Sequence, residues 1–313
     1  MNLNLYQKLL VKNGTSVLVL CLSVLVGCLS GCKSAGNEKI TPTEAYRTIR
    51  DDLGRELILK KEIKRVISLA PSVTELIFEA GGGEKLVGVT TYCNYPEAVR
   101  NIAKVGDTQI PSLEKIVALE PDMVFISKES QLERFSGILT EKGIQVYVVD
   151  PKSPLEIPEE VRRLGEVLST EKLAEQAASA LEKKLDNVLA RAKQITQRPR
   201  VFIQISEEDL FTAGKDSFIT KIVELAGGKS VTDELNEAYP KLSAETAMRL
   251  NPDIILLSES EDNLKPNKAL SDSNAYRNGK IIKINADILS RPGPRSIDAI
   301  AVCNEGFRNF VSN

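Results

Sequence analysis

Short apolar segments alternate with longer amphipathic segments along most of the chain. Four of the short segments are four to six residues long and mostly apolar, which is typical of buried strands: 65–69, 86–90, 144–149 and 281–284. A helix is predicted over 71–80, because Pro71 stands at its start and three glycines follow its end. A hairpin is predicted over 51–59. Alternating strands and helices predict parallel sheets and an α/β fold.

One part of this pattern occurs twice. Serine, glutamate, leucine, proline, aspartate and a closing serine share one register in both copies: Ser112, Glu114, Leu119, Pro121, Asp122 and Ser127, then Ser243, Glu245, Leu250, Pro252, Asp253 and Ser258. Two further segments recur in the same order: 65–69 with 200–204, and 80–82 with 226–228. The repeat predicts two similar Rossmann-like lobes with a ligand cleft between them, since clefts between domains are favoured binding places. The alternative is chance recurrence of a common helix-to-strand joint.

A long amphipathic segment separates the two copies. Apolar residues recur at helical spacing over 169–194, with no glycine or proline between them. At about 1.5 Å per residue, this segment predicts a helix of about 40 Å. We expect one rigid helix to join the lobes and to allow small rocking movements rather than wide closure. The alternative is an ordinary helix packed on one domain.

The N-terminus predicts export and lipidation. Residues 17–26 are apolar except for Ser23, which is too short for a membrane span of about 20 residues and typical of a signal-peptide core. The following Leu29-Ser30-Gly31-Cys32 resembles a bacterial lipobox, so Cys32 is the predicted lipidation site and Cys28 the alternative. An uncleaved signal anchor is a further alternative. The predicted organisation is signal peptide 1–31, lipidated N-terminus and tether 32–47, N-terminal lobe 48–168, connecting helix 169–196 and C-terminal lobe 197–313.

Charge and composition narrow the possible functions. Removing residues 1–31 takes away Lys8 and Lys12 and changes the formal net charge from −2 to −4, which leaves no basic tract for nucleic acid. The chain has no histidine, so a Ser-His-Asp triad and histidine-ligated zinc or haem iron are excluded. No carboxylate pair stands out, so we predict no catalytic residues, no metal and no cofactor. Cys93 and Cys303 either pair in an oxidising compartment or stay free.

Several motifs together resemble the iron-siderophore and vitamin B12 class of ABC-transporter substrate-binding proteins, over roughly residues 48 to 310. They are the segments 65–76, 87–89, 92–96, 113–122 and 211–217, and Arg291-Pro292-Gly293-Pro294-Arg295. Within the class, the turn 92–96 and the spacing of Asp287, Arg291 and Arg295 are most similar to vitamin B12-binding proteins. The resemblance implies two α/β lobes joined by one long helix. It also implies a monomer that delivers its ligand to a dimeric permease with a cytoplasmic ATPase.

The resemblance also implies ligand contacts from both lobes. The expected residues are Ala70, Pro71, Tyr92 and Thr108 in the first lobe, and Leu210, Phe211, Ser290 and Arg291 in the second. Backbone N–H groups after Ala70 would face the cleft, Tyr92 would offer a flat amphipathic ring, and Arg291 would bind amides or phosphate. The alternatives are a tyrosine that anchors a turn, a phenylalanine in the core and an arginine in a surface ion pair.

The chain departs from the B12-binding pattern in two ways. It has no tryptophan, and Thr108 and Ser127 occupy places where an aromatic ring is expected. Some relatives pair a cysteine at the position of Cys303 with one at the position of Ala226, so here Cys303 is expected to be free.

The predicted ligand is vitamin B12 or a related corrinoid. A ferric siderophore is the alternative, but its usual negative charge would require more arginines or lysines than Arg291 and Arg295. A secreted lipoprotein enzyme that uses carboxylates is a more remote alternative.

Glu114 and Glu245 are the predicted permease contacts. Each follows by two residues a serine that can cap a helix, and stabilisation by the helix dipole is the alternative role. The resemblance implies that each lobe presents one of these carboxylates to arginines of the dimeric permease.

Overall fold

The computed structural model describes residues 47–59, 62–128 and 133–311. The predicted signal peptide, Cys28, Cys32 and most of the predicted tether lie outside these ranges. Within them, no helix has both the length and the apolar composition required to cross a membrane. The described chain begins with the predicted hairpin, formed by the antiparallel strands β1 (Arg47–Arg50) and β2 (Glu56–Leu59).

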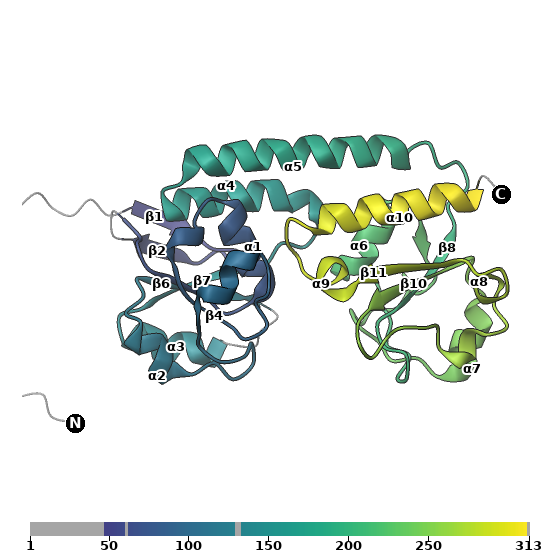
Figure 1. Cartoon of the computed structure of the whole chain (residues 1–313), viewed down its shortest axis with the longest axis horizontal. Coiled ribbons are helices and arrows are strands. Elements are labelled where there is room, and N and C mark those ends of the chain that lie inside the picture. The colour runs from purple at the N-terminus through teal and green to yellow at the C-terminus, as the bar shows by residue number, and fades with distance from the viewer. Residues whose placement is uncertain (1–46, 60–61, 129–132, 312–313) are drawn as a thin grey trace, which may run out of the picture. The chain divides into compact units, whose positions relative to one another are not determined.

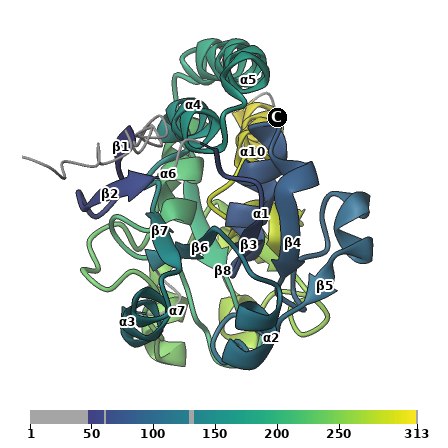
Figure 2. The same cartoon turned by 90° about the vertical axis from the view of Figure 1, so that its left-hand side faces the viewer.

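A five-stranded parallel sheet forms the first lobe (Figures 1 and 2). Its strand order is β5-β4-β3-β6-β7, with β3 (Val66–Ser68), β4 (Leu86–Val89), β5 (Ala103–Lys104), β6 (Met123–Ser127) and β7 (Gln145–Val149). Its helices are α1 (Pro71–Glu79), α2 (Leu113–Ala118), α3 (Glu133–Glu141) and α4 (Ile157–Leu168), with short 3₁₀ helices η1 (Gly83–Lys85), η2 (Glu97–Asn101) and η4 (Pro154–Glu156).

Both faces of this sheet are buried. Met123 and Phe125 of β6 join the core beneath α1 and α4, whereas Val124 and Ile126 join a second core with residues of α2 and α3. Successive residues of a strand point to opposite faces, so a strand covered on both sides becomes a continuous apolar run. That is the physical basis of the short apolar segments in the sequence.

A four-stranded parallel sheet forms the second lobe in the same way. Its order is β11-β10-β8-β9, with β8 (Arg200–Gln204), β9 (Lys229–Ser230), β10 (Ile254–Glu259) and β11 (Ile281–Asn285). Its helices are α6 (Phe218–Leu225), α7 (Ala244–Leu250), α8 (Asn274–Arg277), α9 (Ala286–Leu289) and α10 (Ser296–Val311), with the 3₁₀ helix η5 (Lys268–Leu270). The predicted α/β fold with two similar lobes is confirmed.

The repeated sequence builds the same joint in both lobes. The carboxylate of Asp122 accepts the N–H of Arg65 at 2.9 Å, and that of Asp253 accepts the N–H of Arg200 at 2.8 Å. The N–H of each aspartate donates in turn to the carbonyl of the same arginine, at 2.8 Å in both lobes. Each guanidinium donates to carbonyl oxygens at the end of the helix that precedes the aspartate. The repeat therefore ties a helix end and two neighbouring strands together, once in each lobe.

Helix α5 (Glu171–Ala192) lies between the two sheets in the sequence and packs on α4 and α10 (Figure 1). Its buried stripe of Ala174, Ala178, Leu181, Leu185 and Val188 joins a core cluster that contains residues of both lobes. With 22 residues it is about 33 Å long, shorter than expected.

Helix α5 is two residues shorter than predicted at each end, and at its start a turn separates it from α4. Ser169 adopts a left-handed conformation that ends α4, and α5 begins two residues later. Gly165 allows the two helices to approach closely, since a Cβ there would lie 2.2 Å from that of Ala174. The predicted rigidity of α5 and the predicted lobe boundaries stay predictions.

A buried charged cluster joins the hairpin to α4. Glu160 is fully buried, and its carboxylate accepts a hydrogen bond from Arg163, which also pairs with Asp52 at 2.7 Å. Among the described residues, Oε1 of Glu160 has no hydrogen-bond partner. Burial, reinforced by the nearby Asp52, raises the pKa of Glu160 to about 7.

We therefore expect the stability of the protein to depend on the ionisation of Glu160. Its pKa is higher in the folded state than the ordinary value of 4.5, so the folded protein binds this proton more tightly than the unfolded chain. The free energy of unfolding should fall as pH rises from about 4.5 to about 7, by up to about 3 kcal/mol. In urea unfolding across this range, Glu160→Gln should lose that decrease, and Glu159→Gln at an exposed position of α4 should keep it. An identical pH profile for Glu160→Gln and the unchanged protein would contradict this assignment.

Candidate functional site

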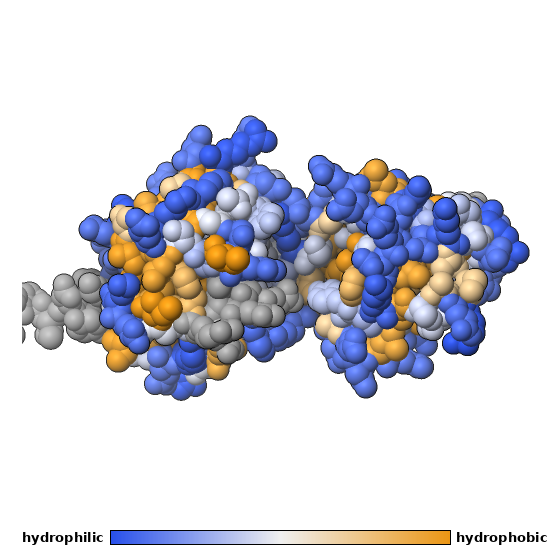
Figure 3. Space-filling model, turned by 90° about the horizontal axis from the view of Figure 1, so that it is seen from below, coloured by the Kyte–Doolittle hydropathy of each residue, from blue (hydrophilic) through white to orange (hydrophobic). Residues whose placement is uncertain are grey.

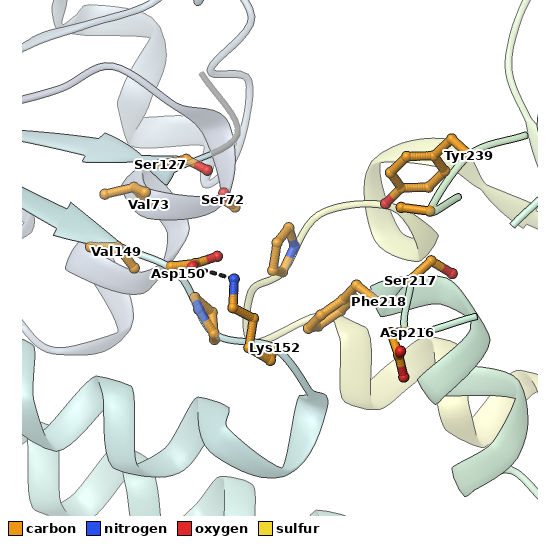
Figure 4. A pocket seen from close by; sticks show the side chains of 13 residues that line it. Ser72, Val73, Ser127, Val149, Asp150, Lys152, Asp216, Ser217, Phe218 and Tyr239 are labelled. Atoms are coloured by element: carbon orange, nitrogen blue, oxygen red, sulfur yellow. Dashed lines mark hydrogen bonds and ion pairs between the residues drawn. The ribbon is translucent and has the colours of Figure 1, made fainter. Parts of the chain in front are cut away.

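A pocket of about 200 Å³ lies between the two lobes (Figure 4). The first lobe contributes residues from the start of α1, the end of β6 and the segment after β7, and the second lobe contributes the start of α6 and two loops. The lining residues are Ser72, Val73, Ser127, Val149, Asp150, Pro151 and Lys152 on one side, and Asp216, Ser217, Phe218, Ala238, Tyr239 and Pro292 on the other. The pocket thus combines hydroxyl and charged groups with apolar walls, which is typical of small-molecule sites.

Buried hydroxyl groups shape the turn from β3 into α1. Thr74 donates from Oγ1 to Ser68 Oγ at 2.8 Å, and Ser68 donates to the carbonyl oxygen of Ala70 at 3.0 Å. The Sγ atom of Cys93 lies 3.1 Å from the hydroxyl oxygens of both Thr74 and Thr90. These contacts fix the position of the first turn of α1 at the pocket.

Both described cysteines are free and buried. The structure therefore favours free thiols at Cys93 and Cys303 over a disulfide between them. Burial also raises the pKa of the Cys303 thiol to about 12, so this group stays protonated and unreactive.

The charges at the pocket are mostly paired. Asp150 is nearly buried, and its carboxylate binds both Lys152 and Lys128, the latter at 3.3 Å. The N–H of Asp150 donates to the carboxylate of Asp52, which links the pocket to the buried cluster at α4. On the opposite wall, Asp216 lies 3.6 Å from Lys221. Two ammonium groups around one carboxylate leave a surplus positive charge on the first lobe's side.

None of the eight predicted ligand contacts lines this pocket, although two of their neighbours, Ser72 and Pro292, do. Ala70 and Pro71 form the N-terminus of α1, next to the pocket lining. Tyr92 is 59% exposed and Thr108 is half-buried. Among the described residues, no hydrogen bond or ring contact joins either of them to the second-lobe residue Phe211.

The other predicted contacts on the second lobe vary in exposure. Leu210 is buried, whereas Phe211 is exposed with the ammonium of Lys241 5.8 Å above its ring. Ser290 is exposed and donates to the carbonyl of Ala286. Ligand contact by these residues stays a prediction.

A buried ion-pair network crosses from one lobe to the other. Glu75 of α1 is 3% exposed, and its carboxylate accepts from Arg295 at 2.8 and 2.6 Å and from Arg291 at 3.1 Å. The hydrogen bonds to Glu75 raise the pKa of Arg295. Sequence reasoning overlooked Glu75, although a carboxylate inside the apolar helix 71–80 was a signal that could have identified it.

The network also holds the turn that carries Tyr92. Arg291 donates to Asn94 Oδ1 at 2.8 Å and to the carbonyl of Tyr92 at 3.4 Å, and it pairs with Asp287 at 2.7 Å. Arg295 lies 4.3 Å from the centre of the Tyr95 ring, in a cation–π contact. Arg291 is thus in an ion pair, as the alternative interpretation of the sequence had it, but the pair is buried between the lobes rather than on the surface.

Glu114 and Glu245 occupy equivalent positions in the two lobes. Each is exposed in the first turn of its helix, α2 or α7, after a serine that caps the helix by accepting a backbone N–H. Both helices lie at the end of the molecule opposite α5 (Figures 1 and 2). Seen from that end, the two lobes meet at a narrow waist (Figure 3). Their contact with a permease stays a prediction.

Comparison with known proteins agrees with this arrangement. Residues 66–288 match the periplasmic binding protein family. The chain is 30% identical over 294 residues to the uncharacterized ABC transporter substrate-binding lipoprotein YvrC of Bacillus subtilis (strain 168), covering 91% of this chain and 93% of the relative. The chain therefore belongs to the periplasmic binding protein family, as a substrate-binding component of the ABC-importer type.

Solved structures share the fold. The periplasmic vitamin B12 binding protein BtuF of Vibrio cholerae superposes with a TM-score of 0.74 at 26% identity, covering 80% of this chain and 99% of that one. A possible iron-binding protein from Staphylococcus epidermidis ATCC 12228 superposes with a TM-score of 0.68 at 27% identity, covering 79% and 99%. Proteins similar to this chain are thus described with two different kinds of ligand.

The ion pairs of Glu75 should stabilise the folded protein strongly. Glu75→Gln leaves the guanidinium group of Arg295 without its carboxylate, while Arg291 keeps Asp287, and breaking a buried pair in this way costs about 3 kcal/mol. Urea unfolding would measure the loss. As a control, Glu97→Gln removes an exposed pair with Arg100 and should cost less than about 1 kcal/mol. Equal effects of the two substitutions would show that the contact between the lobes adds no more than a surface ion pair.

Proposed function

We propose that this protein captures vitamin B12 or a related corrinoid outside the cytoplasm and delivers it to a membrane permease. The observation that carries the proposal is a pocket lined by both lobes of a fold shared with a vitamin B12 binding protein. A ligand held between two lobes is desolvated from both sides. The ligand would also contact both lobes at once. The surface across the two lobes would therefore differ between the ligand-bound and the ligand-free protein.

The size of the pocket limits how a corrinoid would sit. Its volume of about 200 Å³ is below the range of about 300–1,000 Å³ that is usual for ligand sites. The body of a corrinoid would therefore lie outside the pocket, against exposed rings such as Tyr92 and Tyr239 at the rim of the two lobes. An exposed amphipathic ring is suited to a ligand that has an apolar macrocycle and amide arms.

The second candidate ligand is a ferric siderophore or another iron complex, because a possible iron-binding protein has the same fold. The charge distribution favours a corrinoid. Arg291 and Arg295 are both paired with Glu75, so they are not available to neutralise a strongly anionic complex. The lysines around Asp150 provide charge for about one anionic group.

The proposed partners are a dimeric permease and its cytoplasmic ATPase. The paired positions of Glu114 and Glu245 support this, because a two-fold partner would meet one carboxylate on each lobe. We further propose that the protein is a monomer and that a lipid on Cys32 holds it at the outer face of a bacterial membrane. The lipobox and the name of the lipoprotein YvrC support this placement.

Titration calorimetry with defined ligands tests the choice of ligand. Cyanocobalamin and cobinamide should bind, and ferric hydroxamates should not. Tyr92→Ala should weaken cyanocobalamin binding by about 1–3 kcal/mol, the scale of losing one aromatic contact. Because the Tyr92 side chain is largely exposed, the melting temperature of the ligand-free protein should hardly change. Tight binding of a ferric hydroxamate without corrinoid binding would replace the corrinoid proposal by the iron-complex alternative.

Charge reversal tests the proposed docking surface. Glu114→Arg combined with Glu245→Arg should abolish uptake into vesicles that contain the cognate permease, because like charges would then face each other. Cyanocobalamin affinity in solution should change by less than about threefold. The control is Glu171→Arg with Glu305→Arg, which makes the same charge change on α5 and α10. Normal uptake by the folded Glu114/Glu245 variant would show that these residues do not contact the permease and only stabilise their helices.

A further inference from the structure

Two helices, one from each lobe, begin at the pocket. The first turn of α1 contributes Ser72 and Val73 to its wall, and the start of α6 contributes Ser217 and Phe218 (Figure 4). The N–H groups in the first turn of a helix have no partner within the helix and carry partial positive charge. A pocket at which two helices begin is therefore favourable for an anion.

Of the two helices that begin at the pocket, α6 has a capping side chain and α1 has none. Ser217 caps α6 by accepting the N–H of Thr220 at 3.1 Å, whereas Ala70 stands at the cap position of α1 and has no side-chain oxygen. Pro71 fills the first helical position and has no N–H to donate. The N–H groups of Ser72 and Val73 are thus left without a capping acceptor, at the surface of the pocket.

Ser72 provides a second, independent sign of a ligand. The residue is 7% exposed, lines the pocket, and its hydroxyl has no hydrogen-bond partner among the described residues. Buried hydroxyl groups normally have a partner, because burial without one costs free energy. The hydroxyl can donate one hydrogen bond, so it is open to an acceptor that enters the pocket.

The charged side chains around the pocket are compatible with one negative group. On the first lobe's wall, the carboxylate of Asp150 is shared by Lys128 and Lys152, which leaves one positive charge in surplus on that wall. On the opposite wall, Lys221 is shared by Glu224 and by Asp216, whose side chain is largely exposed to water. A ligand with several negative charges would exceed this capacity.

We propose that this pocket binds a single anionic arm of the ligand, a phosphodiester or a carboxylate, while the body of the ligand lies outside it. The Ser72 hydroxyl and the N–H groups of Ser72 and Val73 donate to the arm, and Lys152 supplies the opposite charge. A volume of about 200 Å³ is appropriate for an arm rather than a whole macrocycle. The inference rests on the proposed function in that the ligand enters between the lobes.

Two ligand pairs test the inference. Cyanocobalamin carries a nucleotide loop with a phosphodiester, and dicyanocobinamide lacks the whole loop; hemin carries two carboxylates, which hemin dimethyl ester has as neutral esters. In titration calorimetry, the unchanged protein should bind the anionic member of at least one pair more tightly. The pair whose preference is reduced by the Ser72 substitutions identifies the arm as a phosphodiester or as a carboxylate.

Substitutions at Ser72 should reduce that preference selectively. Ser72→Ala removes one donor and should weaken binding of the anionic member about tenfold. Ser72→Asp places a like charge in the pocket and should weaken it about 100-fold. The neutral member should change less than about threefold with either variant. An acidic residue is favourable in the first turn of a helix, so Ser72→Asp should fold, and thermal melting would check both variants. Ser179→Asp, on the exposed face of α5, controls for the added charge.

Three other results of the calorimetry also test the anionic pocket. Equal losses for the anionic and neutral members would overturn the inference, since Ser72 would then only shape the wall. Selective losses for the hemin pair without any corrinoid binding would uphold the anionic pocket and overturn the corrinoid proposal. If neither pair binds to the unchanged protein, both proposals are wrong.

Discussion

One buried carboxylate forms ion pairs across the two lobes. Glu75 of the first lobe is shared by Arg291 and Arg295 of the second, and these guanidinium groups are largely shielded from water. Separating the lobes would expose all three charges or leave a buried one unpaired, and the latter is strongly unfavourable. The ion pairs also include the turn that carries Tyr92, through Asn94 and Asp287. The width of the pocket therefore depends on contacts that lie beside it.

The two lobes share a scaffold and differ where they meet the ligand pocket. The same arginine–aspartate joint recurs in both, and each lobe presents a serine-capped helix with a glutamate in its first turn. At the pocket the symmetry is broken, because α6 is capped by Ser217 and α1 is left uncapped after Ala70. The frame is common to both lobes, and this difference lies at the starts of two helices, at the ends of strands. Ligand sites of parallel α/β sheets occur at such ends in general.

Different helices lie at the two ends of the molecule. Helix α5 and its contacts with α4 and α10 lie at one end, and the helices α2 and α7 lie at the other. The apolar stripe of α5 joins the cores of both lobes, which supports their mutual placement without occupying the pocket. The exposed glutamates Glu114 and Glu245 lie at the opposite end.

The sequence by itself determined the local elements. Apolar runs, Pro71, the glycines at 81–83 and the repeated serine, glutamate and aspartate positions were enough to predict two parallel α/β lobes and a long helix between them, because these signals depend on near neighbours in the chain. The start of the long helix was predicted two residues too early, since the left-handed Ser169 gives no sequence signal comparable to a glycine. Only the tertiary structure decided which side chains meet across the lobes. Glu75 and Arg295 are far apart in sequence, and whether a charge is buried with a partner or exposed without one depends on how distant segments pack.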